Sequence, residues 1–228
     1  MSTAPAAGGP EATTAGPSLP PIAQAGTAVL RQVAKPVPPE LMGSEWLRNL
    51  VQTMVDVMRA APGVGLAAPQ IGEPWQVVVL EDREELIAKQ AASGLYSPSV
   101  LAAMERRPFR PLALVNPELE AEGAEGVAAF EGCLSVRGYA AVVPRYRRVR
   151  VRALDPEGRP LALEAGGWQA RILQHEVDHV RGVLYVDRML PRSLTASDNL
   201  ADWVRSLPAD LPPLGPCSCC HPIDRLPG

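Results

Sequence analysis

Apolar residues recur at helical spacing in the segment that follows Ser44. They are Trp46, Leu47, Leu50, Val51, Met54, Val55 and Met58. Steps of three and four residues place such side chains on one face of a helix, and a preceding serine can cap the first turn. The pattern therefore predicts an amphipathic helix after Ser44 whose apolar face joins the core.

A second helix is predicted from Trp168 to Val180, because this segment lacks proline and glycine and Gly182 follows where a helix would end. Further helical material is predicted between Glu84 and Met104, inside an insertion. Alternating or β-branched residues predict strands over residues 75–80, 112–115, 140–143, 148–154 and 161–163, with a hairpin turn at 155–158. Because strands and helices do not alternate regularly, we expect an α+β fold with mixed or antiparallel sheets around the second helix.

The composition predicts one folded domain with a tail at each end. With 228 residues, 46% hydrophobic and 21% charged, the chain can form one domain with a sizeable core. Residues 1–20 consist mainly of small residues and proline, and they predict a disordered tail before a folded domain of residues 21–205. Residues 206–228 predict a second tail, rich in proline and cysteine. Its ligand candidates are too closely spaced for a usual structural zinc site, so we expect reactive thiols, with a metal-binding role as the alternative. They are Cys217, Cys219, Cys220 and His221.

Charge excludes some partners. The net charge of −3 gives no electrostatic reason to expect a specific nucleic acid, and no run of 18 apolar residues predicts a membrane span. A basic run alternates with apolar residues, which predicts a strand with one solvated face and leaves a ribosomal RNA contact open. Its members are Arg145, Arg147, Arg148, Arg150 and Arg152. Transit peptides are rich in arginine, yet the first one here is Arg31. We therefore expect a soluble protein of the bacterial cytoplasm, or of the mitochondrial or plastid interior after removal of a transit segment.

Candidate chemistry concentrates in the second helix, as His175-Glu176-Val177-Asp178-His179. Two of the three histidines of the chain stand here, four residues apart and therefore on one helical face. Imidazoles so placed can bind one metal ion, and the glutamate between them can act as general base toward water on that metal. The alternative is two surface histidines on an ordinary helix.

A third ligand is better supplied upstream than downstream. Cys133 is the only cysteine among the first 216 residues, and one thiolate with two imidazoles leaves an open position, as in catalytic sites. The downstream candidates lie in segments that give no sign of packing back. They are Asp187, Asp198, Asp202 and His221. A lone cysteine can also be a small buried hydrophobe.

A glycine-rich segment, residues 63–72, completes the candidate site. It lacks the lysine and hydroxyl of a phosphate-binding loop, but Gln70 could direct an amide donor at a developing oxyanion. A tight structural turn is the alternative.

Taken together, the segments GVGLAAPQIG, EGCLS and QHEVDH resemble the three motifs of the peptide deformylase family, over roughly residues 20–200. The insertion is similar to that of the plant-organellar and mitochondrial branch and its bacterial relatives. The resemblance implies one divalent metal on Cys133, His175 and His179, with Fe(II) in the cell and Zn(II), Ni(II) or Co(II) as replacements. It also implies that Glu176 is the general acid/base, and that Gln70 and the backbone N–H of Leu134 hold the formyl oxygen.

The implied reaction removes the formyl group from the N-terminal formyl-methionine of newly made proteins and releases formate. By position relative to the motifs, we expect the substrate beside Val64 and Gly65, with its methionine near Trp168, Arg171 and Ile172. Two other classes stay open. A zinc peptidase has no need of Cys133 and Gln70, and an inactive binding module should have lost Glu176 or a ligand.

Overall fold

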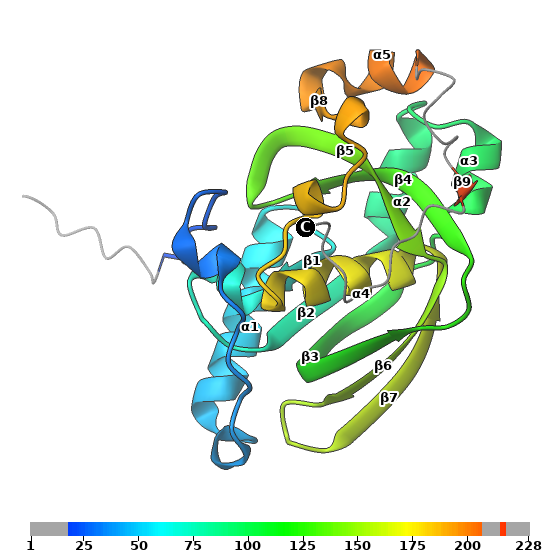
Figure 1. Cartoon of the computed structure of the whole chain (residues 1–228). Coiled ribbons are helices and arrows are strands. Elements are labelled where there is room, and N and C mark those ends of the chain that lie inside the picture. Colours follow the sequence, from blue (N-terminus) through cyan, green and yellow to red (C-terminus); the bar gives the residue numbers. More distant parts are fainter. Residues whose placement is uncertain (1–17, 207–214, 218–228) are drawn as a thin grey trace, which may run out of the picture.

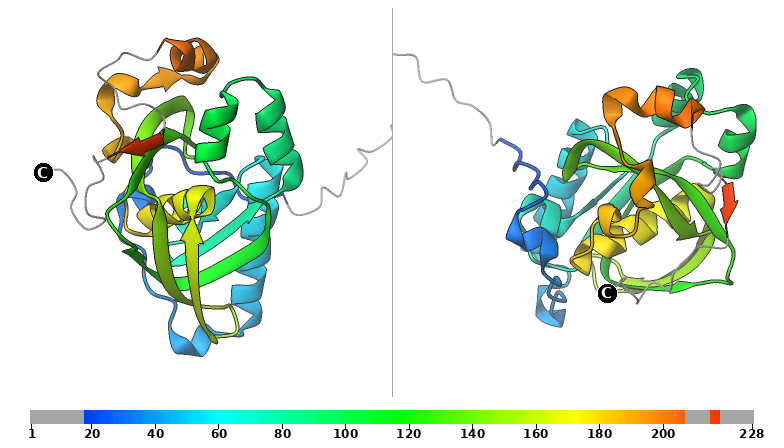
Figure 2. Two further views of the ribbon diagram at one scale, coloured as in Figure 1. Left: turned by 90° about the vertical axis from the view of Figure 1, so that its right-hand side faces the viewer. Right: turned by 45° about the horizontal axis from the view of Figure 1, so that its top comes forward.

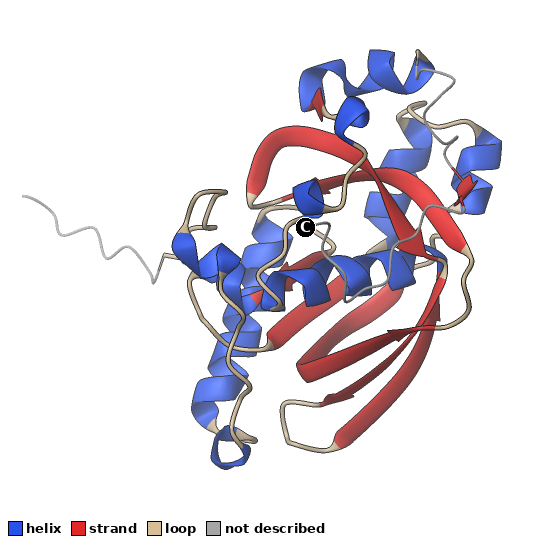
Figure 3. Cartoon of the chain, in the orientation of Figure 1, coloured by secondary structure: helices blue, strands red, loops and turns tan. Residues whose placement is uncertain are grey.

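Two antiparallel sheets enclose one long helix in the computed structural model, which describes residues 18–206 and 215–217 (Figure 1). The helices are α1 Glu45–Ala60, α2 Glu84–Ala92, α3 Pro98–Ala103, α4 Gly167–Val180 and α5 Leu200–Arg205. The strands are β1 Gly65–Ala67, β2 Val77–Asp82, β3 Phe109–Ala121, β4 Gly126–Cys133, β5 Val136–Tyr146, β6 Arg148–Leu154, β7 Pro160–Gly166, β8 Thr195–Ala196 and β9 Gly215–Cys217. Figure 3 distinguishes the helices from the strands.

The five-stranded sheet has the order β1-β2-β3-β6-β7, and the four-stranded sheet has the order β8-β5-β4-β9. Neighbouring strands pair antiparallel in both. The mixed helix and strand content and the antiparallel sheets confirm the predicted α+β class. Because β1 ends the order of its sheet, one side of its backbone is left for another partner.

Strand β2 shows how the two faces of the first sheet are covered. Val77 and Val79 pack with α1, whereas Val78 and Leu80 pack with α4. This alternation follows from the two-residue period of a strand. Helix α1 begins as predicted, since the hydroxyl of Ser44 accepts a hydrogen bond of 3.2 Å from the Leu47 N–H.

Helix α4 contacts strands of both sheets, including β1, β2, β3 and β5, and both views of Figure 2 show it between them. It ends at the predicted residue, Val180, and Gly182 follows with φ +75°. A Cβ atom on Gly182 would lie 2.9 Å from the Arg31 carbonyl oxygen. Glycine is therefore required both by the backbone conformation and by the close approach of the N-terminal segment.

The structure differs from the sequence expectation at several places. Strand β4 was not predicted, and β3 and β5 extend well beyond the predicted segments. The basic run is not one strand with a solvated face, because β5 ends at Tyr146 and β6 begins at Arg148. Its first member, Arg145, is 4% exposed and ion-paired with Glu131 and Asp178. Only the β6 part has the predicted exposed arginines.

The predicted tails fall mainly outside the described residues. Residues 1–17 lie outside them, and so do 207–214 and 218–228, which include Cys219, Cys220 and His221. Within the second predicted tail, β9 pairs with residues 126–128 of β4, where no regular structure was expected. No helix in the described part of the chain is both long and apolar enough to span a membrane.

Candidate metal centre and active site

Helix α4 and the end of β4 bring three potential metal ligands together. The four-residue spacing on α4 places His175 and His179 on one face, and Cys133 lies at the end of β4. One ligand atom from each lies within 4.8 Å of the others. Cys133 Sγ lies 3.3 Å from His179 Nε2. The predicted three residues therefore form one cluster, although they are separated in sequence by strands β5, β6 and β7.

Glu131 orients the first histidine. Its Oε2 lies 2.9 Å from His175 Nδ1, and a carboxylate there holds the proton on Nδ1, which leaves the Nε2 lone pair for a ligand. Burial opposes a charge on this imidazole, but hydrogen bonds to Cys133 and Glu131 raise the pKa of His175 well above its usual value. A metal ion would therefore have to displace the proton on Nε2 when it binds. The sequence did not assign a role to Glu131, although its position two residues before Cys133 is a usable signal.

Glu131 is also the centre of a buried ion network. Both of its oxygens accept hydrogen bonds of 2.9 Å from the Arg145 guanidinium, and Arg171 donates a third of 2.6 Å. Arg145 additionally bonds Asp178, one residue before His179. Burial disfavours the charged carboxylate, but the Arg145 guanidinium outweighs it and holds the pKa of Glu131 well below its usual range. The network therefore fixes the β4–β5 hairpin against α4.

Glu131→Gln should lower the free energy of unfolding by about 3–5 kcal/mol, since it leaves two buried arginines without their shared carboxylate. The measurement is denaturant unfolding beside the wild-type protein. Glu120→Gln is the matched control, because the Glu120–Arg152 pair is about 60% exposed on both sides and such pairs contribute roughly 0–1 kcal/mol. Equal stability of the two variants would contradict a structural role for the network.

Glu176 lies beside the cluster in a dry environment. It is 4% exposed, and its Oε2 has no hydrogen-bond partner among the described residues. Burial raises the pKa of Glu176 to about 7, which is the range in which a carboxyl group both takes up and releases protons at neutral pH. A Cβ on Gly65 would lie 2.7 Å from Glu176 Cδ. The glycine of β1 therefore makes room for this carboxylate.

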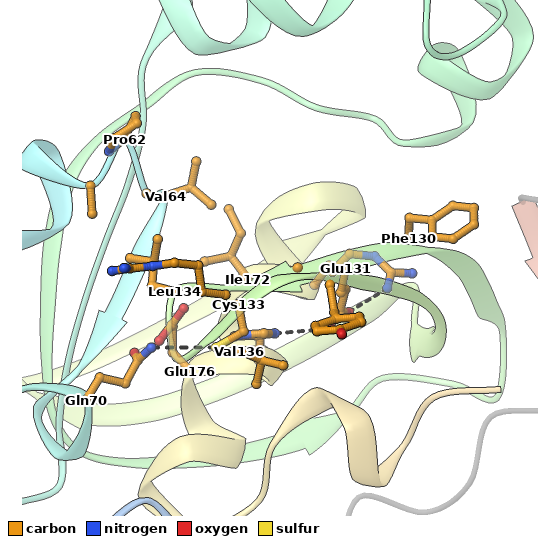
Figure 4. Close-up of a pocket in the computed structure, with 18 of the residues that line it drawn as sticks. Pro62, Val64, Gln70, Phe130, Glu131, Cys133, Leu134, Val136, Ile172 and Glu176 are labelled. Carbon is orange, nitrogen blue, oxygen red and sulfur yellow. Dashed lines mark hydrogen bonds and ion pairs between the residues drawn. The ribbon is translucent and has the colours of Figure 1, made fainter. Parts of the chain in front are cut away.

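Gln70 points its amide nitrogen toward the cluster (Figure 4). The Ala67 N–H donates to Gln70 Oε1 at 2.8 Å, and Nε2 therefore faces Ser135 Oγ at 3.2 Å and Cys133 Sγ at 3.7 Å. Leu134 and Ser135 form the two-residue turn after Cys133, whose register partner is Val136. The Leu134 N–H finds no acceptor within the part of the chain that the structure describes.

A cavity of about 580 Å³ opens onto these groups. Ten of the predicted site residues line it: Val64, Gly65, Gln70, Cys133, Leu134, Trp168, Arg171, Ile172, His175 and Glu176. His179 lies beneath, 1% exposed. The Arg171 guanidinium donates hydrogen bonds to Glu131 and to the Val143 carbonyl. Two guanidinium groups lie near the Trp168 ring, with Arg106 5.3 Å and Arg171 5.9 Å from its centre.

The donor set fits a divalent transition metal. One thiol and two imidazoles suit such ions, and three protein ligands leave room for water or substrate. His179 Nδ1 is buried without a partner in the described residues, as is Glu176 Oε2. This arrangement is the one expected of a metal-dependent hydrolase.

Comparison with known proteins agrees with this chemistry. The model of the family described as polypeptide deformylase matches residues 19–194. The chain belongs to the polypeptide deformylase family. It is 46% identical over 201 residues to the chloroplastic peptide deformylase 1A of Solanum lycopersicum, covering 88% of this chain and 69% of that one. It is 42% identical over 183 residues to the mitochondrial peptide deformylase of Homo sapiens, covering 79% and 73%.

The fold agrees as well. A peptide deformylase from Acinetobacter baumannii, solved with Met-Ala-Ser bound, superimposes with a TM-score of 0.65 at 31% identity, covering 75% of this chain and 99% of that one. The resemblance inferred from the three motifs, including that to plant-organellar and mitochondrial members, is therefore confirmed. Deformylases are metalloenzymes that remove the N-formyl group from nascent peptides, and the chain is an enzyme of this kind.

Proposed function

We propose that this deformylase binds one divalent metal through Cys133, His175 and His179 and uses Glu176 as its general acid/base. The observation that carries the proposal is the convergence of three ligand atoms within 4.8 Å beside a buried carboxylate. When bound, the metal would supply Lewis-acid stabilisation of negative charge and would acidify water. We propose Fe(II) in the cell, with Zn(II), Ni(II) or Co(II) as replacements, since thiolate and imidazole ligands accept all four.

The residues of the chain account for the proton transfers. Glu176 takes the proton from the attacking water and delivers it to the leaving amine as the C–N bond of the formamide breaks, which yields formate and a free N-terminus. Its burial and raised pKa favour both steps near neutral pH. Gln70 Nε2 and the Leu134 N–H would donate to the formyl oxygen as it becomes negative. Gln70 and Leu134 both line the cavity beside Cys133.

The substrate pocket follows from the edge of the first sheet. β1 ends its sheet, and Val64 and Gly65 line the cavity, so an extended peptide can pair with this backbone as an added strand. The methionine side chain would enter between Val64, Trp168 and Ile172. Arg171 would close that wall, with its charge balanced by Glu131. The Met-Ala-Ser bound to the relative from Acinetobacter baumannii supports a peptide of this class.

The proposal extends to the source of the substrate, the compartment and the limits of the catalytic domain. Nascent formylated chains are the substrates, and a place near the ribosomal exit tunnel would supply them. Relatives occur in chloroplasts, mitochondria and bacteria, and we propose either the bacterial cytoplasm or an organelle interior. We also propose that residues 21–205 form the catalytic domain and that residues 1–20 and 206–228 take no part in chemistry.

Cys133→Ser tests the ligand set. A neutral hydroxyl binds these metals far more weakly than thiolate does, so metal content after anaerobic purification should fall well below one ion per chain, together with formate release. His221→Ala is the control, because it removes the only histidine outside the proposed site. A serine variant that keeps one tightly bound ion and full turnover would refute the assignment.

A further inference from the structure

A short segment before the first helix, residues 22–25, touches both loops that carry the proposed oxyanion donors. We call it the N-terminal strap. The Ala23 N–H donates a hydrogen bond of 2.8 Å to the carbonyl of Gln70, and the Ala25 N–H donates one of 2.7 Å to the carbonyl of Ser135. One piece of backbone thus joins the glutamine-bearing loop to the turn that follows Cys133. The side chain of Ile22 lies at the cavity.

The side chain of Gln24 completes the contact with the turn. Its Nε2 donates to the Leu134 carbonyl at 2.9 Å and to the Ile22 carbonyl at 3.2 Å. The Arg137 N–H donates to its Oε1 at 3.3 Å. The amide of Gln24 therefore both donates and accepts hydrogen bonds. Together with the Ala25 N–H, it provides partners for the carbonyls of Leu134 and Ser135.

The consequence concerns the Leu134 N–H. In a two-residue turn, the peptide groups lack the ladder partners that fix a strand. The bond from Gln24 fixes the peptide group between Leu134 and Ser135, which directly follows the peptide group that carries the Leu134 N–H. It therefore limits the rotation of the turn that would direct this N–H away from the cavity. The bond from Ala23 likewise fixes the backbone of Gln70, whose side-chain amide is already oriented by Ala67. The strap therefore ties together the two loops that carry the two donors.

We propose that the N-terminal strap is a positioning element of the active site, and that Gln24 is the positioning residue that aligns Leu134 and Gln70 for the transition state. The proposal rests on the oxyanion roles of those two residues given above. Gln24 does not contact the reacting atoms. Its contribution is pre-organisation, since a misplacement of about 1 Å costs up to roughly 100-fold in rate.

The test separates positioning from stability. Gln24→Ala should lower kcat about 10- to 100-fold for a short formyl-Met peptide, with little change in KM, metal content or unfolding temperature. Gln24→Glu keeps the acceptor for Arg137 but removes the donor to Leu134, so it should behave like the alanine variant. Gln32→Ala is the matched control, because Gln32 is an exposed glutamine outside the strap, also before α1, and its side chain has no hydrogen bond in the described residues. It should match the wild-type enzyme.

Three results would overturn the proposal. They are a kcat for Gln24→Ala equal to that of Gln32→Ala, a loss confined to KM, and a loss that parallels loss of metal or of thermal stability. Glu176→Gln is measured in the same series. If that variant retains turnover, the proposed function itself fails. If Glu176→Gln is inactive and Gln24→Ala is fully active, only the positioning role of the strap is refuted.

Discussion

Glu176→Gln is expected to keep the metal and to lose at least ~100-fold in deformylation, the lower range for a positioned general acid/base. Glutamine has the same shape as glutamate, so the tight packing against Gly65 is preserved. It cannot accept and return a proton, and no other carboxylate in the described residues combines burial, a free oxygen and a place beside the cluster. The measurements are steady-state formate release and metal content.

Glu164→Gln is the matched control for this substitution, because Glu164 lies exposed on β7, away from the cavity. It should retain wild-type turnover. A Glu176→Gln enzyme that binds one ion and turns over within a few-fold of the wild type would show that another group moves the proton.

Gln70→Ala should lower kcat on the order of 100- to 1,000-fold, as expected when one oxyanion donor is removed. The alanine variant also deletes the acceptor for the Ala67 N–H. Gln70→Glu keeps Oε1 as the acceptor for the Ala67 N–H, and it replaces the donor nitrogen with a charged carboxylate oxygen that cannot donate. We expect both variants to lose kcat with a smaller change in KM, measured by steady-state kinetics on formyl-Met-Ala-Ser.

The control for Gln70 is Gln52→Ala on the exposed face of α1, where the side chain bonds only Asp56 among the described residues. A defect of the Gln70 variants confined to KM would instead make this amide a ground-state binding group.

Several elements could be read from the sequence because their signals are local. The α1 helix combines a serine cap with apolar residues at helical spacing, and β6 begins and ends where its alternation predicts. The cluster of Cys133, His175 and His179 was also foreseeable, since two ligands share one helix and a single cysteine precedes them. Identification of the three motifs as one set then supplied the family.

Other features depend on contacts between distant residues. Strand β4 is rich in glycine and alanine and becomes a strand through pairing with β5, so its own sequence gives little signal. In the sequence, Arg145 looks like part of a solvent-exposed basic run. In the structure it is buried, and it pairs with the carboxylates of Glu131 and Asp178, which lie 14 and 33 residues away. Gln24 bonds a carbonyl 110 residues away. Such hydrogen bonds leave no local pattern.

The central claim is that this site hydrolyses the C–N bond between the formyl group and the N-terminal nitrogen, and no other bond. The most direct measurement is product analysis with protein purified without oxygen, on formyl-Met-Ala-Ser, its N-acetyl analogue and unformylated peptides. We predict formate and free Met-Ala-Ser from the first substrate alone, with turnover proportional to bound metal. Cleavage of internal peptide bonds, or no formate from fully metal-loaded enzyme, would contradict the account.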